Sequence, residues 1–354
     1  MKINPDCRYF KGDVPCLPHK KDGVHCEACP HYDPIKEEII IIKTGAAGDV
    51  IRTTPILRKI KQVYPRARIT WVTEFPSLVP ASFVDKIIKF SSPDLLYVLA
   101  ADFDLLYSLD KDYSTTSLAS LIKAKQKIGY ALKANRPAPL NDAADAKYLT
   151  GLFDDVCREN KKHYVEEIFE ICGFKFAQEE YILDLPSHKP KLPAVEGAII
   201  GLNTGCGLRW AARLWPDEKW VELIGLLSRS GYKVLLLGGP QEDDKNKAIS
   251  AASGALYWGI FPLDEFIQVI NACNLIVTQV TMALHLAIAL KKKIVLMNNA
   301  FNRHEFYLYG LGGIIEPDKP CLGCYKGNCQ ESCMSLIEPE KVMEMIEKEL
   351  PNEK

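Results

Sequence analysis

The sequence predicts an α/β protein with two parallel sheets, and three observations support this fold class. Short apolar runs recur along the chain, and the clearest, residues 39–42, is four consecutive isoleucines that cannot alternate between a buried and an exposed face. Such a run is typical of a strand that is buried on both faces of a parallel sheet. Segments with helical periodicity separate these runs, which indicates βαβ units. At 354 residues the chain is long enough for two domains.

The first alternating block, residues 36–185, is predicted to form one Rossmann-like domain. Its strands are expected at 39–43, 69–73, 86–90 and around Leu105, and its helices at 50–64, near 78–84, at 115–124 and at 164–172. Residues 136–140 contain proline and are expected to be a loop. Two basic stretches, 58–68 and 123–133, are interpreted as solvated helix faces, although an anionic acceptor on a membrane surface could also use them.

The second alternating block, residues 194–337, predicts a second Rossmann-like domain with a cysteine-rich tail. Its strands are expected at 198–202, 233–237, 275–278 and 293–297, and its helices at 219–229, from near 243, at 263–272 and at 283–290. Residues 185–193 hold three prolines without periodicity and are the predicted linker. The terminal segment 338–354 is expected to contain a helix at 338–350 that packs back on the first domain.

Composition and charge exclude several classes of protein. The chain is 47% hydrophobic and 25% charged, as expected of a globular protein, and its 44 basic and 45 acidic residues give a net charge of −1. This balance argues against a nucleic-acid partner bound by bulk charge. No run of eighteen apolar residues predicts a membrane span, and the N-terminus lacks the apolar core of a secretory signal. We therefore expect a cytoplasmic protein.

The chain has twelve cysteines, which in the cytoplasm are expected to be metal ligands or buried thiols rather than disulfides. Eight of them form two sets. The N-terminal set lies in a small module, residues 1–35, with few apolar residues to hold it. The two sets are Cys7, Cys16, Cys26 and Cys29, and Cys321, Cys324, Cys329 and Cys333.

Each set contains a Cys-x2-Cys pair, which suits tetrahedral zinc or an iron–sulfur cluster. His19, His25 and His31 are possible substitute ligands in the first set. Plain buried thiols remain an alternative for the second set. We assign both sets to structure rather than to chemistry.

The loop after the first strand is the most informative motif. It contains Gly45 and Gly48, which allow a sharp turn, and then Asp49 at the start of a helix. In open α/β sheets ligands bind beyond the carboxyl ends of the strands, where this loop must lie. Asp49 can therefore cap the helix or face an active site.

The run Lys-Thr-Gly-Ala-Ala-Gly-Asp-Val-Ile-Arg-Thr-Thr-Pro at 43–55 resembles the first strand and loop of glycosyltransferase family 9, the ADP-heptose:lipopolysaccharide heptosyltransferases. The resemblance implies the GT-B fold, two Rossmann-like domains facing a cleft, and a general-base role for Asp49. Lys43, Gly45, Gly48 and Arg52 are assigned to the acceptor side of this loop.

Residues 201–220 resemble the family segment in which a threonine and a basic residue contact the nucleotide phosphates. These roles fall on Thr204, Gly205 and Arg213, the last in place of the usual lysine. A guanidinium can hold a diphosphate in bidentate fashion; the alternative is an ordinary surface arginine. Glu242, after two glycines, resembles the glutamate that binds the ribose hydroxyls, and it could also cap the next helix.

The stretch from Thr278 matches the family pattern in part. Thr281 and His285 are in place, whereas Val280 stands at the usual aspartate and Met282 at the usual glycine. Backbone N–H groups at this helix start could still bind a pyrophosphate. His285 is either a core histidine or a group that stabilises the departing diphosphate. Glu305, in a polar loop, aligns with a glutamate common in the family.

The resemblance covers roughly residues 39–342. It implies an inverting glycosyltransferase that moves a sugar, heptose by analogy, from a nucleotide-diphosphate donor such as ADP-heptose to a lipid-linked saccharide of the lipopolysaccharide type. The enzyme would act at the inner face of the cytoplasmic membrane, without a catalytic metal. Two alternatives remain open: a sugar-nucleotide epimerase of the same fold, and a non-catalytic protein that binds a nucleotide-sugar or a metal.

Overall fold

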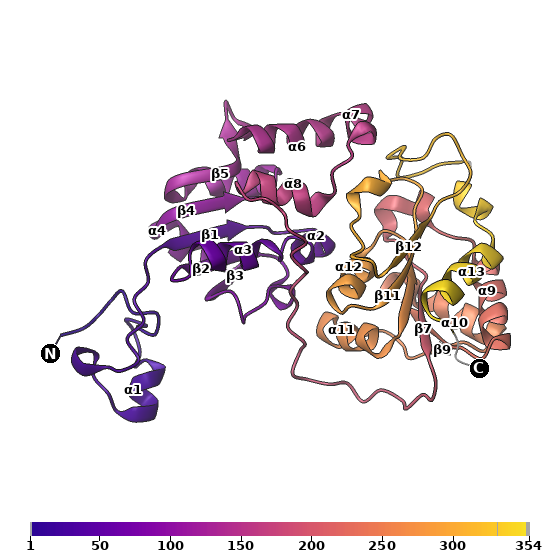
Figure 1. Ribbon diagram of the computed structural model, residues 1–354, viewed down its shortest axis with the longest axis horizontal. Helices are drawn as coiled ribbons and strands as arrows, with labels where there is room; N and C mark the ends of the chain where they lie inside the picture. The colour runs from indigo at the N-terminus through magenta and orange to yellow at the C-terminus, as the bar shows by residue number, and fades with distance from the viewer. Residues whose placement is uncertain (1, 331, 352–354) are drawn as a thin grey trace. The chain divides into compact units, whose positions relative to one another are not determined.

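The computed structural model describes residues 2–330 and 332–351 and divides into two compact units. The predicted segments 1–35, 194–337 and 338–354 include residues 1, 331 and 352–354, and these five residues lie outside the described ones. The first unit comprises Met1–Gly45, Ile56–Asp145 and Ile171–Phe174, and the second comprises Ala46–Pro55, Ala146–Glu170 and Lys175–Lys354 (Figure 1). Each unit contains one six-stranded sheet.

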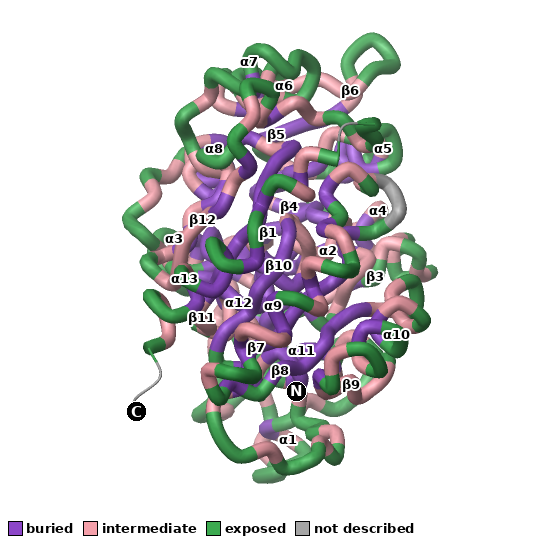
Figure 2. The backbone as a smooth tube through the Cα atoms, turned by 90° about the vertical axis from the view of Figure 1, so that its right-hand side faces the viewer, coloured by how far each residue is buried: buried purple, intermediate pink, exposed green. Residues whose placement is uncertain are grey.

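The sheet of the first unit has the order β3-β2-β1-β4-β5-β6, and only the β5–β6 pair is antiparallel. The isoleucine run forms β1 at the middle of this sheet, where its strand is buried (Figure 2). The core of one face joins β1, β2 and β4 to helices α4 and α5. The bounds are β1 Glu38–Ile42, β2 Arg68–Thr73, β3 Lys86–Lys89, β4 Asp102–Ser108, β5 Lys123–Lys133, β6 Arg136–Pro139, α3 Ile56–Val63, α4 Leu95–Ala100 and α5 Tyr113–Leu121.

Several predictions for the first block, residues 36–185, are wrong. The basic stretch 123–133 is strand β5 rather than a helix face, and the loop at 136–140 pairs with it as β6. Only a 3-10 helix, Pro76–Leu78, forms where a helix near 78–84 was expected. The single helix at 50–64 is two helices, α2 (Ala47–Ile51) and α3, because Pro55 cannot donate a helical hydrogen bond.

The second sheet is entirely parallel, with the order β12-β11-β10-β7-β8-β9. Four strand and helix predictions agree with the structure to the residue: β8, β10, β11 and α11. The strands are β7 Ile199–Asn203, β8 Lys233–Leu237, β9 Leu256–Tyr257, β10 Leu275–Thr278, β11 Lys293–Met297 and β12 Gly312–Ile315. The helices are α9 Asp217–Arg229, α10 Asp243–Ser253, α11 Leu263–Ala272, α12 Met282–Ala289 and α13 Pro339–Glu349.

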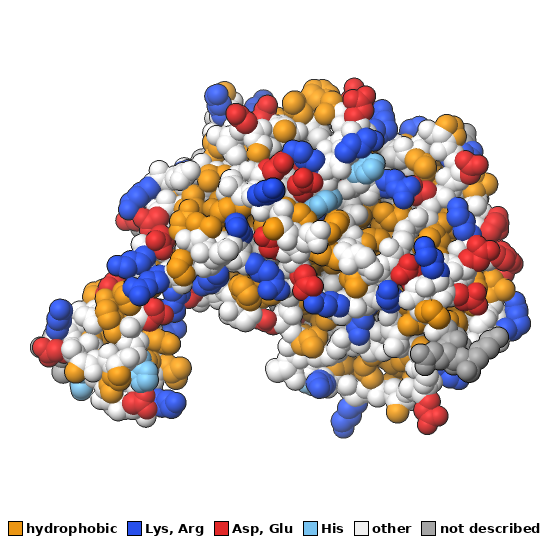
Figure 3. Space-filling view, in the orientation of Figure 1, with side chains coloured by type: hydrophobic (Ala, Val, Ile, Leu, Met, Phe, Trp, Pro, Cys, Tyr) orange, Lys and Arg blue, Asp and Glu red, His pale blue; other side chains and the backbone are white. Residues whose placement is uncertain are grey.

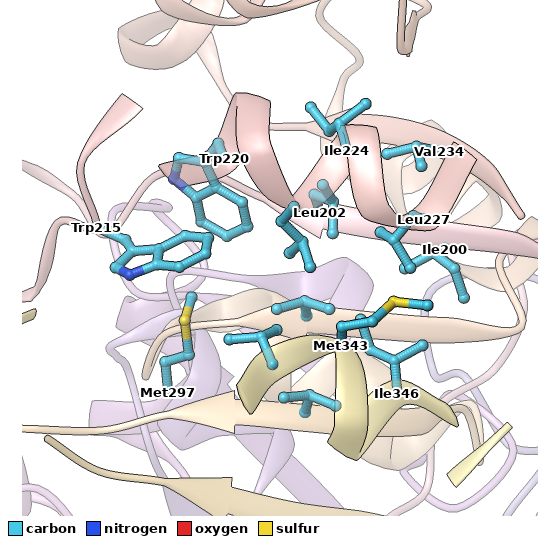
Figure 4. Packing of buried hydrophobic residues seen from close by; sticks show 14 of the residues in the cluster. Ile200, Leu202, Trp215, Trp220, Ile224, Leu227, Val234, Met297, Met343 and Ile346 are labelled. Carbon is cyan, nitrogen blue, oxygen red and sulfur yellow. The ribbon is translucent and has the colours of Figure 1, made fainter. Parts of the chain in front are cut away.

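Two packed tryptophans mark the core of the second unit. The rings of Trp215 and Trp220 meet edge to face with their centres 4.8 Å apart, in a cluster that also contains Leu202 of β7 and Met343 of α13 (Figure 4). Helix α13 thus completes the core of the second unit by packing on α9 and β11. The expectation that this helix packs back on the first domain is wrong, because its apolar face is buried here.

The segment between the sheets carries three helices, α6 (Asp142–Leu152), α7 (Asp154–Glu159) and α8 (Tyr164–Ile171). No helix or strand forms between 172 and 198, a stretch that includes the predicted linker. At the other end, residues 2–35 form α1 (Leu17–Asp22), a 3-10 turn Cys26–Ala28 and a bridge between Cys7 and Pro34. None of the helices that the structure describes is long and apolar enough to cross a membrane.

Candidate active site

The second unit contains a cavity of about 790 Å³ beyond the carboxyl ends of its parallel strands. The loops that follow four strands line it: Gly205 after β7, Gly239 after β8, Val280 after β10 and Phe301 after β11. Strands β8 and β10 flank β7 on opposite sides, so the cavity lies at the switch point of the sheet, where open α/β folds bind ligands.

Most of the predicted site residues meet at this cavity. Its wall includes three residues of α2 and its flanks together with six from the second block. Lys43, Gly45 and Thr204 are not among its lining residues. The predicted residues that line it are Gly48, Asp49, Arg52, Gly205, Arg213, Glu242, Thr281, His285 and Glu305.

Arg213 is a buried cation whose partners are neutral. Its side chain donates from Nη2 to the carbonyl of Cys206 at 2.7 Å and from Nη1 to the carbonyl of Val280, whereas Nε has no partner. The guanidinium also lies 5.1 Å from the ring centre of Phe301. Among the residues that the structure describes, no carboxylate forms an ion pair with it. Burial lowers the pKa of Arg213 to about 10, so it remains charged at neutral pH.

Arg213 is 6% exposed, so it is not the ordinary surface arginine of the alternative interpretation. A buried charge is costly unless a partner compensates it. An anion in the cavity would supply that partner. The short six-residue 3-10 segment Leu208–Arg213 carries this side chain from the loop after β7 to the cavity wall.

Glu242 lies directly against Gly205. Its Oε2 accepts a hydrogen bond from the backbone N–H of Gly239 at 2.9 Å, so the carboxylate caps the turn at the start of α10. A Cβ atom added to Gly205 would lie 2.1 Å from Oε1 of Glu242. A side chain at 205 would therefore force the Glu242 carboxylate to move from this position.

Thr281 and Thr204 have structural partners. Thr281 caps α12 by accepting a hydrogen bond from Ala283 N at 3.2 Å. Thr204 is buried and its hydroxyl donates to Asn246 Oδ1 at 2.6 Å, which turns it away from the cavity. This hydroxyl joins the end of β7 to α10, and the phosphate contact expected of Thr204 stays a prediction.

Asn203 is a site residue that the sequence analysis missed. Its Nδ2 donates to the carbonyl of Gly205 at 3.0 Å and lies 3.2 and 3.3 Å from the hydroxyls of Thr278 and Thr281. It thus ties the loop after β7 to the loop after β10. Its position at the end of a predicted strand was the only signal that could have found it.

His285 is a buried neutral histidine. It is 5% exposed, stacks on Tyr181 with ring centres 6.2 Å apart, and its Nδ1 lies 3.5 Å from the Tyr181 hydroxyl. Burial, aided by the positive charge of Arg52, lowers its pKa to about 3. The ring is therefore neutral at pH 7 and lines the cavity, and its contact with a departing diphosphate stays a prediction.

Asp49 lies in the first turn of α2, whose N-cap is Ala46. Its carboxylate pairs with Arg52 Nη2 at 2.8 Å, and its side chain is 32% exposed. The Arg52 guanidinium lies 3.5 Å above the ring of Tyr164. Burial alone would lower the pKa of Arg52, but the negative charge of Asp49 raises it above its ordinary value. Asp49 is thus an ion-paired carboxylate at the cavity, and not the N-cap residue.

Glu305 is held by two residues that the sequence analysis missed. Its Oε1 accepts a hydrogen bond from the Tyr325 hydroxyl at 2.7 Å, and that hydroxyl lies 2.9 Å from Cys157 Sγ. Asn302 adds to the connection, since its Nδ2 donates to the carbonyl of Cys157 at 2.7 Å. Burial, with the negative charge of Glu305, raises the pKa of Tyr325, so this tyrosine keeps its proton. No local pattern marks Cys157 or Tyr325 as site residues.

Lys43 and Gly45 belong to the first unit. Lys43 is 4% exposed and forms an ion pair with Asp110, which also accepts a hydrogen bond from Thr44 N at 2.5 Å. This contact joins the ends of β1 and β4. Lys43 thus has a structural partner, and its assignment to the acceptor side stays a prediction.

The two cysteine sets differ in their surroundings. The four N-terminal cysteines line one cavity of about 160 Å³, whereas in the tail Cys321 and Cys329 are exposed. Within the described ranges no three His, Cys, Asp or Glu side chains are grouped closely enough to hold a metal ion. Metal binding by the tail set, as zinc or as an iron–sulfur cluster, stays a prediction.

Comparison with known proteins identifies the family. The model of glycosyltransferase family 9 (heptosyltransferase) matches residues 97–301, more than half of the chain. Lipopolysaccharide heptosyltransferase 1 of Escherichia coli (strain K12) is 25% identical in an alignment of 293 residues that covers 72% of this chain and 85% of that protein.

Solved structures show the same fold. The glycosyl transferase family 9 from Veillonella parvula DSM 2008 is 20% identical, with a TM-score of 0.68 over 89% of this chain and 97% of that chain. E. coli heptosyltransferase WaaC with ADP-2-deoxy-2-fluoro heptose is 19% identical, with a TM-score of 0.61 over 88% and 99%. The predicted fold class, with two Rossmann-like units, is confirmed. The chain belongs to glycosyltransferase family 9 and is a glycosyltransferase.

Proposed function

We propose that this enzyme transfers a heptose from ADP-heptose to a saccharide acceptor of the lipopolysaccharide type, with inversion at the anomeric carbon. The names of its relatives support the substrates, since one is a lipopolysaccharide heptosyltransferase and another is described with an ADP-heptose analogue. The observation that carries the donor site is the buried guanidinium of Arg213, which faces the cavity with only carbonyl partners.

The diphosphate of the donor would complete the charge balance of Arg213. The N-terminus of the eight-residue helix α12 lies at the same cavity, through Met282 and Ala283, and its N–H groups favour an anion. These groups belong to the backbone, so the replacement of the family aspartate by Val280 leaves them in place. Val280 even supplies a carbonyl that orients Arg213.

Asp49 is the proposed general base. An acceptor hydroxyl oxygen forms the new bond to the anomeric carbon while the bond to the diphosphate breaks on the opposite face, and Asp49 takes the hydroxyl proton. The pairing of Asp49 with Arg52 at 2.8 Å holds the carboxylate at the cavity. Arg213 and the α12 N-terminus stabilise the leaving diphosphate, so we propose no divalent ion at the reacting centre, and turnover in EDTA should match turnover in Mg²⁺.

The acceptor and the place of action are also proposals. We infer a lipid-linked saccharide and a peripheral contact with the inner face of the cytoplasmic membrane, because a heptosyl acceptor of the lipopolysaccharide type carries a lipid. Binding of the full chain to vesicles that contain such an acceptor, compared with vesicles of the same lipids without it, would test this contact.

The central test uses Asp49→Asn, with Asp94→Asn, an exposed change outside the cavity, as the matched control. We expect the Asp49 variant to bind ADP-heptose in calorimetry with the affinity of the unmodified enzyme and to lose turnover by at least a hundredfold. NMR of the product should show the inverted anomer. Retained turnover would exclude Asp49 as the base. A new sugar-nucleotide formed without an acceptor would establish an epimerase, and binding of a nucleotide-sugar without any turnover would establish a non-catalytic protein.

A further inference from the structure

The N-terminal module, residues 2–35, has almost no hydrophobic core. Only Cys7 and Pro18 are buried in it, whereas large apolar side chains such as Ile3 and Leu17 are 56% and 68% exposed. Several apolar side chains accordingly lie on the module's surface, among charged and polar groups (Figure 3). So small a segment needs a metal, a disulfide or a partner to hold its fold, and its cysteines form no disulfide in the structure.

The four cysteines of the module surround a single cavity. They come from separate turns: Cys7 from the first loop, Cys16 from the N-cap of α1, and Cys26 and Cys29 from the ends of the 3-10 turn. All four line the same space of about 160 Å³. The backbone N–H of Cys29 donates to the carbonyl of Cys26 at 3.5 Å, which closes the Cys-x2-Cys turn. The fold therefore brings four thiols that lie up to 22 residues apart in the chain to the wall of one cavity.

The histidines of the module are separable by their contacts. His31 pairs with Asp22 at 2.9 Å on the surface and does not line the cavity. His19 and His25 line it and meet edge to face at 5.3 Å, and His19 Nδ1 is bonded to the carbonyl of Val24 at 3.0 Å. His19 and His25 therefore form part of the wall of the cavity that the four cysteines also line. The four cysteines are therefore taken as the ligand set of the module.

We propose that Cys7, Cys16, Cys26 and Cys29 bind one Zn²⁺ ion that holds the module together, at a site independent of sugar transfer. Four thiolates are a typical tetrahedral set for structural zinc, with Zn–S distances of about 2.3 Å. The described residues include no ready-made group of metal ligands, so the four sulfurs must approach one another to share one ion. Zinc draws the four sulfurs inward as each thiol releases its proton to solvent.

The zinc site also supports the attachment of the module to the first sheet. Arg8, next to Cys7, pairs with Asp33 at 2.9 Å and with Asp85, and donates to the carbonyl of Ala67 at 3.2 Å. Asp85 in turn accepts a hydrogen bond from Ile69 N of β2 at 2.8 Å. A fixed Cys7 therefore fixes the anchoring arginine, and loss of zinc should release the module from this edge of the sheet.

The test measures zinc in the full-length enzyme, purified under reducing conditions from zinc-supplied cells. The double variant Cys26→Ser/Cys29→Ser should contain one zinc fewer per chain than the unmodified enzyme. Its matched control, Cys321→Ser/Cys324→Ser, makes the same change in the tail set and should keep this zinc. X-ray absorption of the control should show four sulfur neighbours around zinc. Limited proteolysis should cut the N-terminal variant within residues 2–35 much faster than the control.

Equal zinc in the N-terminal variant and the unmodified enzyme would overturn the proposal, as would iron in place of zinc or a nitrogen ligand in the absorption spectrum. If the double variant does not fold, the unmodified enzyme decides the question by titration with a mercurial reagent. Release of one zinc as four thiols react supports the site, whereas four reacted N-terminal thiols without zinc release exclude it. Donor binding in the second unit should be the same in all three proteins.

Discussion

At the scale of single residues, the proposed donor site depends on the positive charge of Arg213, whose hydrogen-bond partners in the structure are carbonyl oxygens. Arg213→Lys keeps the charge but cannot retain both carbonyl bonds of the guanidinium while it contacts a diphosphate. We expect the affinity for ADP to fall by about tenfold to a hundredfold, or about 1.4 to 3 kcal/mol, as for the loss of a hydrogen bond to a charged group. Calorimetry with ADP measures this, and Arg229→Lys on the exposed end of α9 is the control.

An unchanged affinity for ADP in Arg213→Lys, beside an unchanged Arg229→Lys control, would mean that the diphosphate is held elsewhere. The donor-site assignment would then be wrong even if the enzyme remained active.

A second residue-scale prediction concerns the orientation of Glu305. Tyr325→Phe removes the hydroxyl that donates to Glu305 at 2.7 Å and accepts from Asn302 N at 3.0 Å. Without it the carboxylate is free to rotate at the cavity wall, so we expect kcat/KM for the donor to fall about threefold to tenfold, from loss of one hydrogen bond. The change should appear mainly in KM if Glu305 binds the donor.

The control for this prediction is Tyr309→Phe, which removes a hydroxyl that donates to the backbone carbonyl of Glu179 at 2.8 Å. Tyr309→Phe removes this one hydrogen bond, whereas Tyr325→Phe removes the bonds to both Glu305 and Asn302, so Tyr325→Phe should lower stability more and KM is the quantity that separates the two variants. If the two variants also showed the same KM, Tyr325 would have only a structural role.

At the scale of helices and strands, the close approach of α2 to α12 is what brings Asp49 to the cavity. Gly48 makes this approach possible, since a Cβ atom there would lie 2.5 Å from Cδ2 of His285. Gly48→Ala should therefore destabilise the enzyme by about 1 to 3 kcal/mol, as overpacking does in well-packed interiors, and should lower turnover by displacing α2. Chemical denaturation measures the first effect and an initial-rate assay the second.

The matched change at Gly225 should have the opposite sign. Gly225 lies within α9, and a Cβ atom there would meet only Arg229 Nη1, at 3.5 Å. Alanine has the higher helix propensity, so Gly225→Ala should stabilise the enzyme by up to about 1 kcal/mol. A Gly48→Ala variant as stable and active as Gly225→Ala would show that α2 and α12 do not depend on this contact.

The sequence predicted elements well where a single pattern decides them. β8, β10 and β11 are continuous apolar runs between turns, and their bounds were predicted correctly. β5 was missed because lysines alternate with its other residues, and only pairing with β4 and β6 makes it a strand. The break between α2 and α3 was missed although Pro55 signals it, because the apolar periodicity continues across it.

The residues of the candidate site also divide into those that a local sequence pattern reveals and those that only the fold brings together. Asp49, Gly205 and Arg213 follow strands within contiguous motifs, and the structure places all three at the cavity. Cys157 and Tyr325 are 168 residues apart in sequence, so only the folded chain reveals their contact. Thr204 shows the converse, since its motif suggested a ligand contact while its partner, Asn246, lies on a distant helix.

At the scale of the whole molecule, resistance to acid should reflect the neutral histidine buried in the second unit. The native pKa of His285 is lowered to about 3 by burial and by Arg52, whereas an ordinary histidine has a pKa of about 6.5. Between these values the unfolded chain binds a proton that the native protein does not bind. The free energy of unfolding must therefore fall as pH falls from 6.5 toward 3, by about 1.4 kcal/mol per pH unit from this group alone, and this loss is absent above pH 6.5.

Replacement of His285 by glutamine should remove that contribution from the pH dependence, although the variant starts from a lower stability at pH 7.5. Denaturation of the unmodified enzyme and of His285→Gln at pH 7.5, 6.0 and 4.5 measures the two slopes. His188→Gln, whose side chain is 73% exposed, controls for the loss of an imidazole. Carboxylates contribute to the acid sensitivity of all three proteins alike, so the difference between slopes isolates His285. If the free energy of unfolding depended on pH in the same way in the unmodified enzyme and in His285→Gln, His285 would bind its proton equally well in the folded and unfolded chain. The α2–α12 contact would then open to water below pH 6.5.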